Sequence, residues 1–435
     1  MKTFPVQKEA APRFSGLAKV KSDIHRKLLG RLNLSNLELV SKEEAIATIR
    51  EVIQDLLNAQ GTQVALNLAE REQLAQEILD EIFGLGPLEP LMKDPELSDI
   101  LVNTFDDVWV ERFGKLYKTD IQFQNDRHLL QVIDRIVSGV GRRIDDSSPM
   151  VDARLPDNSR VNAIIPPLAI DGPHLSIRRF KLDVLTGEDL LGKDTLTAPM
   201  LEVLKGAVKA RLNILISGGT GAGKTTLLNV LSSAIPSNER IVTIEDSAEL
   251  QLRQPHVVRL EARPPNVEGK GAVPVRSLVI NSLRMRPDRI IVGEVRGPEA
   301  VDMLQAMNTG HDGSLTTLHA NTPRDALNRL GTMVSMANLS LPDRAISQQI
   351  AGGIQLVIQL GRLPDGNRKI VSVSEITGME GEIITMQELF VFERKGLEED
   401  GKVRGRFKST GIRPKFTDLL KARGIEFDAS IFLDA

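Results

Sequence analysis

The stretch that most constrains this chain is a glycine-rich turn between an apolar run and a helical pattern. Residues 214–217 predict a buried strand, and apolar residues at helical spacing follow the turn. The turn satisfies the spacing G-x-x-x-x-G-K-[ST] of a phosphate-binding loop in the strand–loop–helix setting that the motif requires. The motif residues are Gly218, Gly223, Lys224 and Thr225. A chance glycine turn followed by Lys-Thr is the alternative, and both flanking elements argue against it.

Such a loop predicts a nucleoside triphosphate site. Glycines let successive backbone N–H groups point at phosphate oxygens, and the start of the helix adds unpaired donors. We expect Lys224 to reach the β- and γ-phosphates of ATP and the Thr225 hydroxyl to bind Mg²⁺. The expected nucleotide-binding residues of the loop are Gly218, Gly219, Thr220, Gly221, Ala222, Gly223, Lys224, Thr225 and Thr226.

The composition excludes several classes of function. A single Trp, a single Tyr and a net charge of −3 do not favour a nucleic-acid surface, so we expect no nucleic-acid partner. The absence of cysteine excludes disulfides and thiolate metal sites, and we expect no zinc. No apolar run approaches the ~20 residues that span a bilayer, and the N-terminus lacks a signal segment. We therefore expect a cytoplasmic protein.

The periodicity of apolar residues divides the N-terminal part in two. After a mobile arm over residues 1–20, helical spacing over 24–57 and 70–83 predicts a small helical module. Period-two patterns and a helix from 127 to 140, capped by Asp126, then predict a compact α+β domain. Its expected strands are 99–102, 108–112, 115–118, 174–180 and a hairpin over 154–161.

The C-terminal part alternates helices with apolar strands, which indicates an α/β domain with helices on both faces of a sheet. Its expected strands are 213–217, 241–245, 257–260, 290–293, 314–319 and 356–360. From Asp365 onward the pattern has period two. We expect five segments, namely an arm and helical module (1–75), an α+β domain (76–181), a hinge (182–198), an ATPase domain (199–376) and a β-rich extension (377–435).

Two further strands end in acids. Glu294 follows an apolar strand that we expect to lie next to the loop strand, where it can orient or deprotonate water and hold the Mg²⁺ shell. Gly293 before it would permit close approach to the nucleotide. Residues 241–250 supply Glu245, Asp246 and Glu249, whose mutual repulsion a bound cation would offset. The alternative for Glu294 is a carboxylate that faces solvent. The alternative for the acids of residues 241–250 is a cap of the next helix.

Residues 309–322 are dense in hydrogen-bonding groups and contain two histidines. His319, at a strand end, could sense the γ-phosphate or bridge to Glu294, and a purely structural histidine is the alternative. A zinc site formed with His311 is not expected, because no third ligand lies at metal-binding spacing.

Together these motifs resemble a known family. The phosphate loop, "IEDSAEL", "DRIIVGEVRG" and "TGHDGSLTTLHANT" resemble the Walker A, Asp box, Walker B and His box of type II/type IV secretion and pilus ATPases. Segments such as "VDARLPDNSRVNAIIPP" and "VSEITGMEGEIITMQELF" are similar to the tight-adherence (Flp) pilus branch. The resemblance extends over most of residues 20–420.

The resemblance implies a fold and a function. The fold is a RecA-like P-loop NTPase domain, preceded by a small α+β (PAS-like) domain and an N-terminal helical module. The function is a homohexameric ATPase that powers pilus assembly at the cytoplasmic face of the inner membrane. The implied partners are membrane platform proteins and, indirectly, pilin, and some relatives also retract pili. The lack of cysteine separates this chain from the branch with a four-cysteine zinc module.

Site residues carry over from the same motifs. The implied catalytic residues are Lys224, Glu294, Glu245, Asp246, Glu249, His319, His311 and Arg296. Arginines of the N-terminal domain reach the nucleotide in relatives, and the matching segments contain Arg154, Arg160, Arg178 and Arg179. Gly293 stands where many P-loop proteins place a metal-binding Asp. Whether Glu294 or the Asp box supplies the base is therefore open.

Other functions share these motifs. A conjugation or effector-secretion ATPase would carry the same four boxes, a RecA-type nucleic-acid translocase is a more distant alternative, and a nucleotide-gated scaffold would not need the acids. A basic tail could face acidic loops of a membrane platform or anionic lipid, or form a solvated hairpin. Its residues are Lys402, Arg404, Arg406, Lys408, Arg413 and Lys415.

Overall fold

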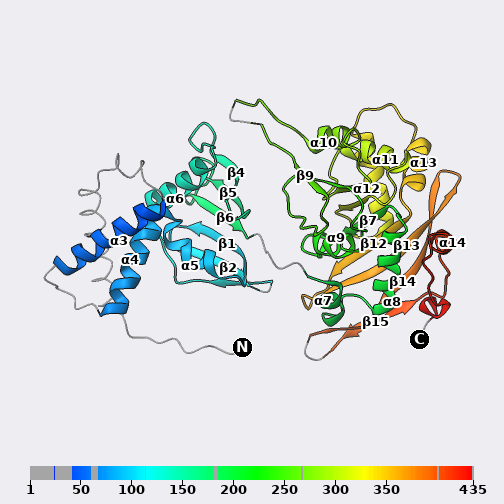
Figure 1. Cartoon of the computed structure of the whole chain (residues 1–435), viewed down its shortest axis with the longest axis horizontal. Coiled ribbons are helices and arrows are strands. Elements are labelled where there is room, and N and C mark those ends of the chain that lie inside the picture. The colour runs from blue at the N-terminus through cyan, green and yellow to red at the C-terminus, as the bar shows by residue number, and fades with distance from the viewer. Residues whose placement is uncertain are drawn as a thin grey trace. The chain divides into compact units, whose positions relative to one another are not determined.

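The computed structural model describes residues 24, 42–59, 67–112, 114–179, 185–265, 268–398 and 401–433. It divides into two compact units, Met1–Lys181 and Leu182–Ala435 (Figure 1). The expected N-terminal arm lies outside the described residues, as do residues 25–41 of the predicted helical module. No helix in the described part of the chain is long and apolar enough to cross a membrane.

Unit 1 begins with two packed helices. Helix α3 (Lys42–Ala59) and helix α4 (Leu68–Phe83) bury an aliphatic cluster that includes Ile49, Ile53 and Ile78. Asn67 starts α4 with a reciprocal capping box: the Asn67 side chain accepts from the Glu70 N–H, and the Glu70 side chain accepts from the Asn67 N–H. A 3₁₀ turn, η1 (Gly86–Leu88), and helix α5 (Glu89–Lys93) follow.

The rest of unit 1 is a six-stranded sheet, in the order β3-β2-β1-β6-β5-β4 among the described residues. The strands are β1 (Leu97–Thr104), β2 (Asp107–Arg112), β3 (Lys115–Lys118), β4 (Met150–Arg154), β5 (Arg160–Ile164) and β6 (His174–Arg178). Helix α6 (Asp126–Gly139) packs Leu129, Val132 and Ile133 into the core that the sheet shares. Asn125, rather than the predicted Asp126, caps α6, because its side chain accepts from the His128 N–H.

Unit 2 is built on a sheet whose nine described strands run in the order β15-β14-β13-β12-β7-β11-β10-β8-β9. From β12 to β9 every neighbouring pair is parallel, whereas β13, β14 and β15 add on in antiparallel fashion. The strands are β7 (Ile214–Gly218), β8 (Ile241–Glu245), β9 (Val257–Glu261), β10 (Arg289–Val292), β11 (Leu315–Leu318), β12 (Leu356–Arg362), β13 (Arg368–Glu380), β14 (Ile383–Leu397) and β15 (Val403–Ser409).

Helices cover both faces of this sheet (Figure 1). Strand β7 shows why, because Ile214 and Ile216 enter one aliphatic core and Leu215 enters the other. The first core is closed by α7 (Gly187–Gly192), α8 (Ala198–Lys209), α9 (Lys224–Ser232), α14 (Thr417–Ala422) and η2 (Ala429–Phe432). The second is closed by α10 (Val275–Ser282), α11 (Glu299–Asn308), α12 (Pro323–Ser335) and α13 (Asp343–Gly353). The predicted α/β fold class is confirmed.

Two predicted segments differ from the structure. The proposed hinge 182–198 contains α7, which starts with a Thr186 capping box and buries Leu190 in the core of unit 2. The proposed extension 377–435 continues the same sheet through β13, β14 and β15, and Phe390 lies in that core. Polar composition and a change of period did not reveal that residues of both segments share the core of unit 2, whereas the division between Lys181 and Leu182 coincides with the predicted start of the hinge.

Candidate active site

Motifs that are distant in sequence meet at one edge of the unit 2 sheet. Strands β7, β11, β10 and β8 are parallel, so their carboxyl ends lie along the same edge. Beyond these ends lie the loop after Gly218, then His319, Glu294 and Glu245 in the spatial order of the strands. The sheet therefore assembles the four predicted boxes into one candidate site.

The phosphate loop has the backbone that its glycines predict. Gly221 and Gly223 adopt φ values of +69° and +97°, in the left-handed region that favours glycine. A Cβ on Gly218 would lie 2.8 Å from the Leu360 carbonyl oxygen, so a side chain there would collide with β12. Helix α9 begins at Lys224 with Gly223 as its N-cap, which leaves its first N–H groups available to an anion.

Lys224 is a buried cation whose partners are neutral. Its Nζ donates to the carbonyl oxygens of Gly218 and Gly219 at 3.2 Å each, and it lies 3.3 Å from both ring nitrogens of His319. Burial lowers the pKa of Lys224 and Arg296 lowers it further, whereas Glu294 opposes the shift. A buried ammonium group held by carbonyls is suited to bind an anion that enters the loop.

Glu294 links His319 to two further charged side chains. Its Oε1 lies 2.7 Å from His319 Nε2, and its Oε2 accepts from Arg296 Nη2 at 2.6 Å and from Nε at 2.9 Å. Arg296 Nη1 in turn lies 3.5 Å from Asp246 Oδ2. Burial and the charge of Lys224 lower the pKa of His319, although Glu294 raises it, and the lower pKa favours the neutral imidazole.

Strand β11 lies between β7 and β10, so the expectation that Glu294 follows the neighbour of the loop strand is wrong. This insertion places His319 between Lys224 and Glu294. The segment that carries Glu294 is held to β11 by two bonds: the Thr317 hydroxyl donates to the Gly293 oxygen at 2.7 Å, and the Val295 N–H donates to the Thr317 oxygen at 2.8 Å.

Glu245 is the most buried carboxylate of the site, with 4% of its surface exposed. Its Oε2 accepts from the N–H groups of Glu249 at 2.7 Å and Leu250 at 3.0 Å, whereas no described residue donates to its buried Oε1. Burial raises the pKa of Glu245 to about 7. A Cβ on Gly293 would lie 2.8 Å from Glu245 Cγ. The absence of a side chain at Gly293 therefore makes room for Glu245.

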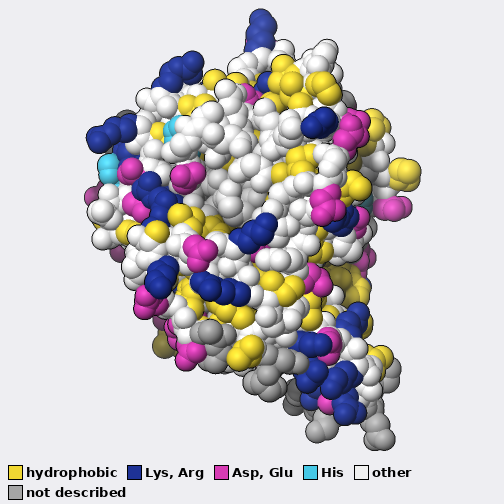
Figure 2. All heavy atoms as spheres, turned by 90° about the vertical axis from the view of Figure 1, so that its right-hand side faces the viewer, with side chains coloured by type: hydrophobic (Ala, Val, Ile, Leu, Met, Phe, Trp, Pro, Cys, Tyr) yellow, Lys and Arg dark blue, Asp and Glu magenta, His cyan; other side chains and the backbone are white. Residues whose placement is uncertain are grey.

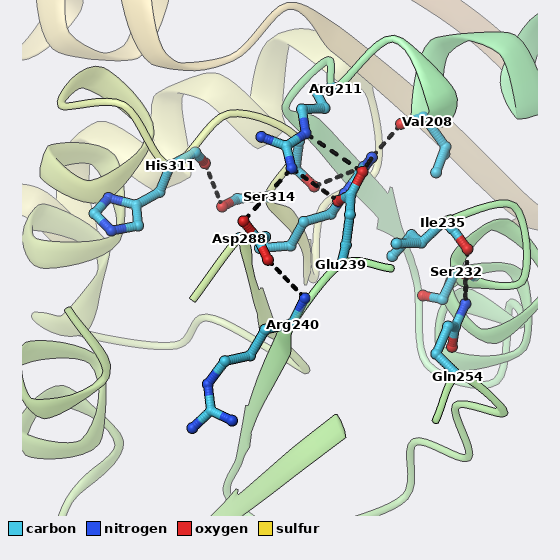
Figure 3. Close-up of polar contacts among 12 residues, drawn as sticks. Val208, Arg211, Ser232, Ile235, Glu239, Arg240, Gln254, Asp288, His311 and Ser314 are labelled. Carbon is cyan, nitrogen blue, oxygen red and sulfur yellow. Dashed lines mark hydrogen bonds and ion pairs between the residues drawn. The ribbon is translucent and has the colours of Figure 1, made fainter. Parts of the chain in front are cut away.

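His311 does not lie at this edge. It precedes β11, whereas His319 follows it, so the two histidines lie at opposite ends of one strand. Figure 3 shows His311 in the same region as Arg211, Glu239 and Asp288, where Arg211 forms ion pairs with the two acids. The His311 carbonyl accepts from the Ser314 hydroxyl at 2.8 Å. Within one chain, the structure therefore does not bring His311 together with Lys224, Glu294 and His319, because strand direction separates the two ends of the His box.

The predicted arginines of unit 1 do not all share a surface. Arg154 pairs with Arg160 across β4 and β5, and Arg160 pairs with Arg178 across β5 and β6. Direct partners in an antiparallel sheet project to the same face, so these three form a row. Arg178 Nε lies 3.2 Å from Asp99 Oδ1 at the end of this row.

Arg179 alternates to the opposite face of the sheet. Its Nη1 donates to the carbonyl oxygens of Leu91 and Asp94, at 3.1 Å each, at the C-terminal end of α5. This contact anchors α5 to β6. The structure therefore gives Arg179 a role within the fold of unit 1.

Two arginines near the phosphate loop were missed. Arg362 ends β12 and Arg368 begins β13, and the two are partners across the hairpin. Arg368 Nε donates to the Gly221 carbonyl at 2.7 Å. The signal for them was present in the sequence: an arginine at the carboxyl end of a predicted parallel strand lies at the same edge as the loop.

The comparisons with known proteins identify the family. The family model described as "Type II/IV secretion system protein" matches residues 81–408. A Mycobacterium tuberculosis protein provisionally named for conjugal transfer is 39% identical over 325 residues, which cover 73% of this chain and 92% of the relative. The type IV secretion system protein PtlH of Bordetella pertussis is 33% identical, over 64% of this chain and 90% of PtlH. The conjugal transfer protein TrbB of Rhizobium radiobacter is 34% identical, over 58% and 74%.

Two solved structures are also similar to parts of this chain. The VirB11 ATPase from the Brucella suis type IV secretion system, in complex with sulphate, is 28% identical, with a TM-score of 0.36 and coverage of 69% of this chain and 96% of VirB11. The pilus retraction motor PilT with bound ADP is 20% identical, with a TM-score of 0.47 and coverage of 67% and 79%. The family match extends over about three quarters of the chain, so this protein belongs to the Type II/IV secretion system protein family.

Proposed function

We propose that this chain hydrolyses ATP as a homohexameric motor at the cytoplasmic face of the inner membrane and powers assembly of tight-adherence (Flp) pili. The observation that carries the ATPase proposal is the continuous run of contacts from Lys224 through His319 and Glu294 to Arg296 beside the phosphate loop. The pilus system is supported by the resemblance of the N- and C-terminal motifs to that branch. In some relatives the same motor also retracts pili. The proposal for this chain is pilus assembly, with retraction as a second activity of the same motor.

The site fits a magnesium nucleotide. Two left-handed glycines shape the loop, and the buried ammonium of Lys224 contacts carbonyls that phosphate oxygens can replace as its partners. Thr225, the second residue of α9, would hold Mg²⁺, and Glu294 would hold it through water. When bound, the metal neutralises charge that develops on the β- and γ-phosphates. No group of three His, Asp or Glu side chains among the described residues is arranged to bind a metal without a nucleotide.

Glu294 is the better placed base. Arg296 holds its Oε2, and its Oε1 lies 2.7 Å from His319 Nε2, so the carboxylate is oriented to accept a proton from an attacking water. Glu245 is protonated for about half of the time at neutral pH, because burial raises its pKa to about 7. His319 contacts both Lys224 and Glu294. When a γ-phosphate takes the place of the present partners of Lys224, His319 can pass that change to Glu294.

The arginine row of unit 1 supplies further positive charge. Arg154, Arg160 and Arg178 lie together on one face of the sheet, and the proposal is that they reach the nucleotide of their own or a neighbouring subunit. Arginines that stabilise a phosphoryl-transfer transition state typically contribute about 10³–10⁵ in rate. Arg179, which holds α5, is a weaker candidate for this role.

Platform proteins of the membrane are the proposed partners, with pilin reached indirectly. Figure 2 shows Lys and Arg side chains gathered at the lower end of the face that it draws, the end at which Figure 1 draws β15. Arg404, Arg406 and Lys408 alternate along that strand and project to one face. Glu393 pairs with Arg406 and Lys408, which offsets part of this charge within the fold. No nucleic-acid partner and no zinc are part of the proposal.

The test uses purified full-length protein. Lys224→Ala should lose ATP binding, whereas Glu294→Gln should bind ATP with Mg²⁺ and hydrolyse it at least about 100-fold more slowly. Lys209→Ala and Glu382→Gln, which change exposed side chains of the same types, should match the wild type. A wild-type turnover rate in Glu294→Gln would refute its assignment, and a wild-type protein without affinity for ATP would refute the function. ATPase activity that rises with protein concentration, together with a native mass of six chains, would support the hexamer.

A conjugation or effector-secretion ATPase is the second candidate, because the similar proteins of M. tuberculosis and R. radiobacter are named for conjugal transfer. Deletion of the gene in its host would distinguish the two. Loss of surface pili with unchanged DNA transfer supports the pilus motor, and the reverse supports conjugation. ATPase activity that requires added DNA would instead indicate a nucleic-acid translocase.

A further inference from the structure

The turn between β12 and β13 lies against the outer side of the phosphate loop. Arg368 Nε donates to the Gly221 carbonyl at 2.7 Å, and Arg368 Cδ lies 3.5 Å from the position that a Cβ of Gly223 would take. Arg362, its partner across the hairpin, places Nη1 3.6 Å from the corresponding position on Gly221. One arginine pair from another element therefore lies beside both left-handed glycines of the loop, and Arg368 bonds to one of them.

This contact determines which way one loop peptide points. In a trans peptide the C=O and N–H groups project in opposite directions. The Gly221 carbonyl faces Arg368, so the Ala222 N–H projects away from it, and this N–H donates to the Gly219 carbonyl within the loop at a long 3.3 Å. A glycine at φ +69° can reorient its peptide at little cost, so the guanidinium supplies a restraint that the loop itself lacks.

The residues after Arg368 are firmly anchored. Lys369 is 7% exposed, its Nζ contacts Asp194 Oδ2 at 2.6 Å, and the same atom lies 5.8 and 5.7 Å from the ring centres of Phe392 and Phe407. The Ile370 N–H donates to the Thr195 carbonyl at 2.9 Å. The start of β13 is thus fixed to the α7–α8 turn on one side and to the β14–β15 ribbon on the other.

The turn is also held from β15. Asp365 Oδ2 accepts from the Val403 N–H at 2.9 Å, and Oδ1 accepts from the Asn367 N–H at 3.0 Å. These bonds lower the pKa of Asp365, with the Val403 bond the largest cause. Because the turn is restrained by the C-terminal ribbon, Arg368 reaches the loop from a rigid base.

We propose that Arg368 is a positioning residue for the phosphate loop: it holds the Gly221–Ala222 peptide in one orientation, with the Gly221 carbonyl turned outward and the Ala222 N–H turned into the loop. It acts from outside the loop, through the Gly221 carbonyl. The ribbon β14–β15 supports it through the β12–β13 turn. This inference rests on the proposed nucleotide-binding function.

The first test needs no nucleotide. Amide hydrogen exchange over residues 218–226 of the full-length, nucleotide-free protein should be about threefold or more faster in Arg368→Gln than in the wild type. Arg368→Lys, which keeps a charged donor, should give an intermediate rate. Arg344→Gln removes an exposed arginine of α13, away from the loop and the ribbon, and is the matched control. Equal exchange in Arg368→Gln and the wild type, or the same increase in Arg344→Gln, would overturn the proposal.

The second test separates binding from turnover. Loss of one charge-assisted hydrogen bond at an exposed side chain should raise KM for ATP about fivefold in Arg368→Gln, with kcat within about twofold of the wild type. A lower kcat at unchanged KM would contradict a positioning role. A wild-type protein that fails to bind ATP would refute the proposed function. The exchange measurement needs no ATP, so it tests separately whether Arg368 restrains the loop.

Discussion

Glu245 allows a quantitative test of the site, because its burial changes how stability depends on pH. The carboxyl group accepts two backbone N–H bonds through Oε2, yet desolvation outweighs them and raises its pKa from 4.5 to about 7. The substitution Glu245→Gln imitates the protonated form and cannot ionise. We therefore expect the variant to be progressively more stable than the wild type as the pH rises.

The sign and size follow from proton linkage. Below pH 4.5 the carboxyl group is protonated in both the folded and the unfolded chain, so it contributes no pH dependence. Between pH 4.5 and 7 the unfolded chain releases the proton and the folded chain retains it, so the free energy of unfolding falls as the pH rises. At about 1.4 kcal/mol for each pH unit, the loss is roughly 3 kcal/mol and is complete above pH 7.

Urea unfolding of the full-length, nucleotide-free protein at pH 5, 6, 7 and 8 measures this difference. Circular dichroism follows both units, whereas fluorescence of the single tryptophan, Trp109 on β2, follows unit 1 and serves as an internal control. The free energy of unfolding of Glu245→Gln relative to wild type should rise by about 2.5 kcal/mol between pH 5 and 8 in the unit 2 transition alone, because part of the loss has already occurred at pH 5. A difference that does not change with pH would refute the conclusion that Glu245 titrates near neutrality.

Three further predictions follow from contacts at both edges of the sheet. Gly293→Ala should destabilise unit 2 by about 1–3 kcal/mol in urea unfolding, because the added Cβ would overlap the buried side chain of Glu245. Unchanged stability would show that Glu245 can move away. Arg289→Ala should cost about 3–5 kcal/mol, because fully buried Arg289 donates to Glu239 at 2.5 Å, and a loss below about 1 kcal/mol would contradict this. His319→Ala should slow ATP hydrolysis at least about tenfold, whereas His311→Ala should leave ATP affinity unchanged. If both variants changed hydrolysis and ATP affinity equally, the conclusion that the two histidines lie at different sites within one chain would be contradicted.

The sequence by itself determined the elements and the identity of the phosphate loop. The G-x-x-x-x-G-K-[ST] spacing works through local backbone geometry, because a strand, left-handed glycines and a helix start lie within one continuous stretch. Helices α4 and α6 and most strands were also predictable, because caps and apolar periods are local signals. Local signals do not show that α7 belongs to the core of unit 2.

The tertiary structure alone decided which side chains meet. Strand order places β11 between β7 and β10, so His319 lies between Lys224 and Glu294, and strand direction separates His311 from that site. Only packing shows that Gly293 makes room for Glu245 and that Arg368 supports the loop from a hairpin about 150 residues further along the chain. These contacts join residues that are far apart in sequence, and their free energies depend on burial and on neighbouring strands, which periodicity in the sequence does not encode.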